Sequence, residues 1–129
     1  MKEAKAPLTP EEELQVIIDK AKKKHGRVYK TIIADEVIVW RLLKRGEFKD
    51  IMNQAIFRLE DVVGENEEVK QMEVIDEDAT YDLRQELIAK AVIIHPAGIV
   101  DNMAAVADII STECMLKSGF GEAPITEQC

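Results

Sequence analysis

The sequence predicts an α+β domain that is mostly helical, with about four helices and a small antiparallel β element. Apolar residues recur at three- and four-residue spacing in four segments, which is typical of amphipathic helices. The segment 28–42 is instead rich in Val, Ile, Tyr and Thr, as strands are. The 129 residues correspond to one ordinary domain. We therefore expect a single domain over 1–129, with flexible ends at 1–8 and 122–129 and an acidic linker at 64–78.

The stretch LTPEEELQVIIDKAKKKHG, residues 8–26, predicts the first helix. Thr9 suits the N-cap and Pro10 the first helical position, and the three glutamates that follow favour the positive end of the helix dipole. Lysines fill the last turn, and Gly26 can end the helix in a left-handed conformation.

The next stretch, RVYKTIIADEVIVWRLLK, predicts a hairpin of two short strands at 28–33 and 37–42. Ala34 and Asp35 interrupt the two apolar runs, although no Asn-Gly or Asp-Gly pair marks the turn. Trp40, the only tryptophan, would lie at the centre of one apolar face.

A second helix is predicted over 45–64, because the apolar residues of RGEFKDIMNQAIFRLEDVVG recur at helical spacing and Gly64 can end it. The acidic stretch 65–79 has few apolar residues. It is either an extended linker or an edge strand protected by charge.

Two further helices complete the prediction. The first covers 79–96 and stops at Pro96, since the residue before a proline avoids the helical region. An HPAG turn follows, and the last helix covers 99–122 with Asp101 at its N-cap and Gly119 after its last turn.

The net charge of −8 is unevenly distributed: residues 1–59 sum to +4 and residues 60–129 to −12. Such a division can steer a basic partner toward the second half, or it can simply keep the protein soluble.

No run reaches the roughly 18 apolar residues of a membrane span, and the first residues lack the apolar core of a secretory signal. Cys114 and Cys129 are too few for a disulfide framework, which favours a reducing compartment.

The residues expected of a catalytic or metal site do not occur in a matching pattern. His25 and His95 have no Cys or His at zinc-ligand spacing. An EF-hand reading from Asp76 fails, because its sixth and twelfth positions hold Tyr81 and Leu87. There is no G-x-S-x-G elbow and no phosphate-binding loop. We predict a protein that is not an enzyme, with no catalytic residue, no metal and no cofactor.

Two alternatives remain open at this point. The segment 20–30 contains six Lys or Arg and one Tyr, so a small nucleic-acid-binding adaptor is the main alternative. The sequence pI of about 4.8 argues against it. The other is an enzyme whose site is assembled from distant carboxylates: Asp35, Glu36, Asp82 and Glu86.

Three segments together resemble small proteins of tailed bacteriophages, the tail assembly chaperones or baseplate assembly proteins. They are VIVWRLLKRGEFKDI at 37–51, HPAGI at 95–99 and ADIISTECMLKSGFG at 107–121, about a third of the chain. The matching elements are a Trp-Arg pair, a short charged helix start, a His-Pro turn and a closing Ser-Gly-Phe; Leu42 stands where the relatives often carry Pro.

The resemblance implies a non-catalytic bacteriophage protein of the tail or baseplate. Its partners would be other tail or baseplate proteins, with an oligomer compatible with such an assembly. It would be found in the host cytoplasm during assembly or in the virion. The residues expected to bind partners are Trp40, Arg41, Arg45, Phe48, Ile51, Met52, Met115, Leu116 and Phe120. Each apolar candidate has a structural alternative, since Trp40 and Phe48 fit a core and Phe120 a helix C-cap contact.

Overall fold

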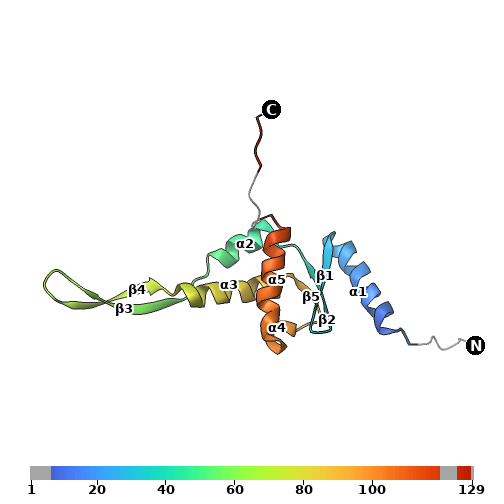
Figure 1. Ribbon diagram of the computed structural model, residues 1–129, viewed down its shortest axis with the longest axis horizontal. Coiled ribbons are helices and arrows are strands. Elements are labelled where there is room, and N and C mark those ends of the chain that lie inside the picture. Colours follow the sequence, from blue (N-terminus) through green and yellow to red (C-terminus); the bar gives the residue numbers. More distant parts are fainter. Residues whose placement is uncertain (1–6, 120–124, 129) are drawn as a thin grey trace, which may run out of the picture.

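A computed structural model describes residues 7–119 and 125–128 of the chain (Figure 1). The described residues are 50% helical and 25% strand, which confirms the α+β, mostly helical class. In chain order the elements are α1 (Pro10–His25), β1 (Val28–Ile33), β2 (Glu36–Arg41), α2 (Arg45–Met52), β3 (Phe57–Val63), β4 (Val69–Ile75), α3 (Glu77–Val92), β5 (Ile93–His95), α4 (Ile99–Asn102) and α5 (Ala104–Lys117).

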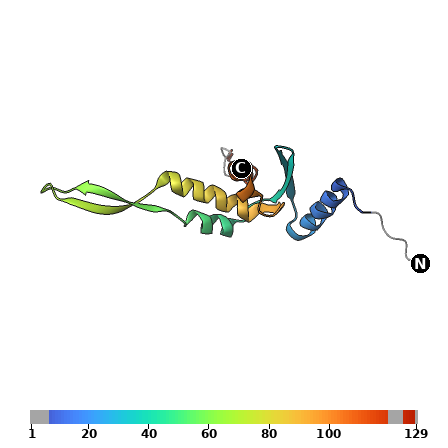
Figure 2. The same cartoon turned by 90° about the horizontal axis from the view of Figure 1, so that it is seen from below.

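The molecule is elongated, with a two-stranded hairpin at one end and α1 at the other (Figures 1 and 2). Between them lies a body made of a three-stranded antiparallel sheet, in the order β1-β2-β5, and of helices α2 to α5.

The first helix forms as predicted. Thr9 Oγ1 accepts a hydrogen bond from Glu12 N, and the Glu12 carboxylate accepts one from Thr9 N, which is a capping box. Gly26 ends the helix at a φ of 80°. Ala21 of this helix and Val39 of β2 are buried outside the main core, where α1 lies against the sheet through β1.

The predicted hairpin at 28–42 is also confirmed: β1 and β2 pair antiparallel, with Tyr29 opposite Trp40. Ala34 and Asp35 form the turn with positive φ values of 47° and 66°. Two consecutive positive φ angles are what a tight hairpin turn requires, and here neither residue is glycine.

The main core lies between this sheet and α2, α3 and α5. Trp40 is only 1% exposed, stacks on Tyr29 with ring centroids 4.8 Å apart, and donates from Nε1 to Thr31 Oγ1 at 2.8 Å. The other fully buried side chains of the core come from β2, α3 and α5: Ile38, Val92, Val106, Ile110, Cys114 and Ser111.

The prediction of one helix over 45–64 is wrong. The helix ends at Met52, and 57–63 forms β3, which pairs with β4 from Phe57 opposite Ile75 to Val63 opposite Val69. A short apolar run fits a helical and an extended period equally well, so the spacing alone did not distinguish the two. The acidic stretch that follows is a strand over 69–75, the second of the two alternatives considered.

The third and last helices are shorter than predicted. The third ends at Val92, because Ile93 and His95 pair with the open edge of β2 as strand β5. The predicted last helix is divided at Met103, whose backbone is extended, so α4 and α5 are separate. Asp101 lies within α4 and is not an N-cap.

Candidate interaction surfaces

The hairpin of β3, β4 and the loop 64–68, hereafter the arm, projects from the body into solvent (Figures 1 and 2). All of its strand residues are exposed except Val74, which is half-buried. Cross-strand pairing places five large apolar side chains on one face, each 52–69% exposed: Phe57, Leu59, Val63, Val69 and Ile75. Three polar or charged residues, at 61, 71 and 73, share this face and separate the apolar pair at the tip from the apolar residues at the base. The opposite face is mixed, with Met72 and Val62 beside charged residues.

An arm of this kind is poorly stabilised by itself. A two-stranded hairpin is marginally stable in water, and several large apolar side chains exposed on one element favour an interaction site. Beyond its base, where Val74 is half-buried and Ile75 borders the helices, the strands of the arm are exposed on both faces. The arm is therefore the most exposed element of the described fold.

The base of the arm is fixed to α3 by polar contacts. Thr80, 3% exposed, accepts from Ile56 N at 2.9 Å and donates to Ile56 O at 3.3 Å through its hydroxyl. Asp76 N donates to Ile56 O at 2.8 Å. Arg84 donates from Nη2 to Met52 O at 2.8 Å and from Nε to a neighbouring carbonyl. These bonds hold the arm in line with α3 (Figure 1).

A groove of about 710 Å³ adjoins the arm, between α3 and α5. Its lining is mainly apolar, and Ile75 belongs both to the arm and to the groove. The other apolar lining residues are Met52, Tyr81, Ile88, Met115 and Leu116. Arm and groove thus form one continuous apolar region.

The structure brings together some of the residues predicted to bind partners. Met52, Met115 and Leu116 all line the groove. Arg45 and Phe48 line a second, smaller depression of about 530 Å³ between α2 and the end of α5.

Three other predicted contact residues are placed elsewhere. Trp40 and Ile51 lie in the core, at 1% and 6% exposure, so neither side chain is presented to a partner in this structure. Phe120 lies outside the described residues.

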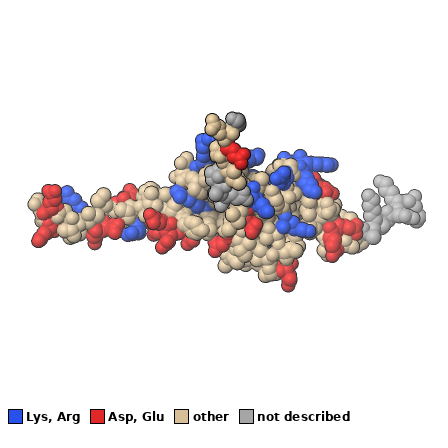
Figure 3. Space-filling view, turned by 45° about the horizontal axis from the view of Figure 1, so that its top comes forward, with Lys and Arg blue, Asp and Glu red and all other residues tan. Residues whose placement is uncertain are grey.

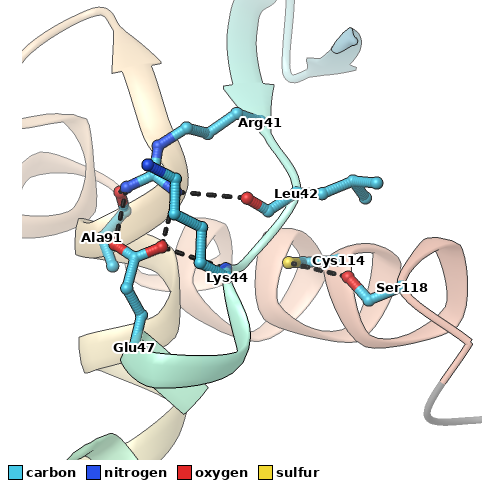
Figure 4. Close-up of polar contacts among 7 residues, drawn as sticks. All are labelled: Arg41, Leu42, Lys44, Glu47, Ala91, Cys114 and Ser118. Carbon is cyan, nitrogen blue, oxygen red and sulfur yellow. Dashed lines mark hydrogen bonds and ion pairs between the residues drawn. The ribbon is translucent and has the colours of Figure 1, made fainter. Parts of the chain in front are cut away.

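Arg41, the remaining candidate, forms a bidentate ion pair within the chain (Figure 4). Its Nη1 and Nη2 each lie 2.7 Å from a Glu47 carboxylate oxygen. The guanidinium also donates to the carbonyls of Leu42 and Ala91, and Glu47 accepts from Lys44 N at 3.0 Å. Hydrogen bonding to Arg41 lowers the Glu47 pKa from 4.5 to about 2. Arg41 therefore joins β2, α2 and the end of α3, which is a structural role.

Cys114 is buried in the core, with its sulfur 3.9 Å from Ser118 Oγ (Figure 4). Burial raises the pKa of its thiol. A buried thiol with a raised pKa holds little of the nucleophilic thiolate form, so Cys114 fits a packing role.

The four carboxylates considered for an enzyme lie on two separate parts of the fold. Asp35 and Glu36 lie at the turn between β1 and β2, whereas Asp82 and Glu86 are on α3. Glu86 pairs with Lys90 at 2.7 Å. None of the four lines the groove.

Two findings concern metals and membranes. Within 7–119 and 125–128, no three or more His, Cys, Asp or Glu residues gather in a way that could hold a metal ion. Nor does that part of the chain contain a helix with the length and apolar character needed to cross a membrane.

Sequence reasoning missed the arm itself. The spacing of Leu59, Val62 and Val63 predicts the apolar stripe of a helix, and Val69 and Ile75 belong to the stretch predicted as a linker or an edge strand. The available signal was the pair of β-branched runs on either side of Gly-Glu-Asn-Glu-Glu, a polar stretch with the length and composition of a hairpin loop. Comparison with models of protein families, with curated proteins and with solved structures finds no significant match.

Proposed function

We propose that this chain is a non-catalytic assembly protein of a bacteriophage tail or baseplate, acting through protein–protein contacts as an assembly chaperone or a minor structural component. The observation that supports contact as its function is the apolar arm, which projects from the body with both faces uncovered. The phage setting comes from the sequence resemblance at 37–51, 95–99 and 107–121.

The arrangement of polar contacts supports a recognition role for the arm. The bonds from Thr80 and Arg84 set its direction relative to α3. An element that is ordered before binding loses less conformational entropy on association. The groove beside its base extends the apolar area that a partner can cover.

Affinity purification tests this proposal. A tagged chain is co-expressed with the tail proteins encoded beside it, and the recovered proteins are identified by mass spectrometry. We expect Leu59→Asp with Val63→Asp to reduce partner recovery at least about tenfold, because two charges replace apolar contacts. Asn66→Asp with Gln71→Asp is the matched control, since it adds the same charge to the arm and keeps its apolar residues. Equal recovery with both double variants would refute a contact role for the arm.

A further inference from the structure

The arm and the segment 20–30 carry opposite charge. The arm, residues 57–75, contains six acidic and two basic residues, a net charge of −4. The segment 20–30, which runs from the end of α1 into β1, contains six Lys or Arg and no Asp or Glu. Figure 3 shows acidic side chains along the arm, basic ones on the body and beside α1, and further acidic ones at the α1 end of the molecule, where α1 begins with three glutamates at 11–13. The arm and α1 lie at opposite ends of the long axis (Figure 1).

The cations of segment 20–30 are open to a partner in the part of the chain that the structure describes. Lys22, Lys23, Lys24, Arg27 and Lys30 are all exposed. Of the ion pairs formed among the described residues, none includes a residue of this segment. Each of these cations would attract a partner that carries carboxylates and so favour its binding.

The same end also offers an apolar side chain. Ile32 is 64% exposed and lies two positions after Lys30 on β1, hence on the same face of that strand. Hereafter the basic end means residues 20–30 together with Ile32. It combines cations with apolar area, as the arm combines carboxylates with apolar area.

Charge also argues against a contact between two arms. Two arms of net charge −4 repel one another, whereas the arm and the basic end attract. A contact between copies is therefore expected to join unlike surfaces. Contacts of that type produce rings or filaments, in contrast to two-fold dimers.

We propose that the arm of one copy docks on the basic end of a second copy, so that the chain associates head to tail. This inference rests on the proposed function and names its partner as another molecule of the same chain. It also gives the segment 20–30 a protein ligand, in contrast to the nucleic acid considered from the sequence.

Sedimentation velocity over a concentration series tests this contact with purified full-length chain. We expect species larger than the monomer whose amount rises with concentration. Raising the salt from about 0.1 M to about 1 M shortens the Debye length from about 10 Å to about 3 Å, and we expect it to weaken association.

Charge reversal at each end separates head-to-tail association from other arrangements. The arm variant carries Glu65→Lys, Glu67→Lys and Glu68→Lys, which changes the net charge of the arm from −4 to +2. The basic-end variant carries Lys22→Glu, Lys23→Glu and Lys24→Glu. Each variant alone is expected to associate at least about tenfold more weakly, and an equimolar mixture is expected to recover association. Circular dichroism checks that both variants keep their helix content.

Three results would overturn the inference. One is a wild-type chain that stays monomeric at every concentration. Another is a basic-end variant that still associates as the wild type does, which would indicate an arm-to-arm contact. The third is salt-dependent binding of the segment 20–30 to duplex DNA without self-association, which would identify that segment as a nucleic-acid site. None of these results changes partner recovery in the co-expression experiment, so the proposed function is judged separately.

Discussion

At the scale of single residues, the Arg41–Glu47 pair shows how one ion pair organises three elements. The pair is bidentate at 2.7 Å, and Arg41 also bonds the Ala91 carbonyl near the end of α3 at 2.8 Å. Glu47 in turn caps the start of α2 by accepting from Lys44 N. Removing the carboxylate leaves a half-buried guanidinium without its counter-charge, which costs stability.

The pair gives stability a defined pH dependence. The Glu47 pKa is about 2 in the folded protein and 4.5 ordinarily, so the folded state disfavours the protonated carboxyl. The ion pair contributes fully to the free energy of unfolding above pH about 4.5, and this contribution is lost as the pH falls toward about 2. The shift corresponds to about 3 kcal/mol at most, and partial exposure reduces this to about 1–2 kcal/mol.

Urea denaturation of the wild type and of Glu47→Gln checks this expectation. We expect a difference of about 1–2 kcal/mol at pH 7 that closes by pH about 2. Glu60→Gln, on the exposed arm, is the control and should change the unfolding free energy by less than about 0.5 kcal/mol at either pH. A pH-independent difference for Glu47→Gln would disprove the linkage.

Trp40 is the second residue with a measurable consequence. We expect Trp40→Ala to destabilise the fold by about 3–5 kcal/mol, because it empties a buried site. Trp40→Phe keeps most of the packing and loses the hydrogen bond to Thr31, so a cost of about 1–2 kcal/mol is expected. Thermal unfolding followed by circular dichroism measures both. Equal costs for the two variants would contradict a packing role for the indole.

At the scale of elements, the sequence predicted the helices and strands that neighbouring residues determine. It did not predict the strands that form only by pairing with another segment. The first helix followed from Thr9, Pro10 and the glutamates, which all act within one turn. The β1–β2 hairpin followed from its composition. Strand β3 could not be predicted from the sequence, because its apolar residues also match the stripe of a helix. Only pairing with β4 distinguishes the strand from the helix. For the same reason the short strand β5, which depends on β2 more than fifty residues earlier, was read as the end of a helix.

Some residues of the candidate site could likewise be predicted from the sequence, and others could not. The apolar residues of the predicted amphipathic helices pointed to Met52, Met115 and Leu116, and the fold brings these residues together in one groove. Strand alternation also correctly placed Trp40 on an apolar face, but the exposure of a side chain depends on tertiary packing, which buries Trp40 fully. The first strand of the arm was predicted as helix and the second only as one of two alternatives, so the pairing that places the five apolar residues on one face was not predicted.

The junction of the arm and α3 offers a test at this scale. Thr80→Val removes the hydroxyl that bonds both the N–H and the carbonyl of Ile56. A buried donor left without a partner costs about 1–3 kcal/mol. We expect a loss of that size in urea denaturation, and faster amide hydrogen exchange at Ile56 and Asp76. Thr112→Val, at an exposed position on α5, should leave both unchanged. Unaltered exchange at the arm base in Thr80→Val would show that Thr80 does not fix the arm.

At the scale of the whole molecule, elongation follows from the way the apolar residues are distributed. One core forms between the three-stranded sheet and α2, α3 and α5, while the arm and much of α1 remain outside it. A compact 129-residue domain has a radius of gyration of about 14 Å. Small-angle scattering of the basic-end variant, in which association is suppressed, should give a clearly larger value. A value near 14 Å would mean that the arm folds back on the body in solution.

Hydrogen–deuterium exchange of the arm, in the isolated chain and in the assembly that contains it, is the decisive measurement. If the arm binds other protein subunits, amides in 57–63 and 69–75 exchange quickly in the isolated chain and at least about a hundredfold more slowly in the assembly, because exchange then requires release of the partner. Core amides on β2 serve as the internal reference. If the arm amides exchange at the same rate in both states, the arm is not a contact surface and the proposed function fails.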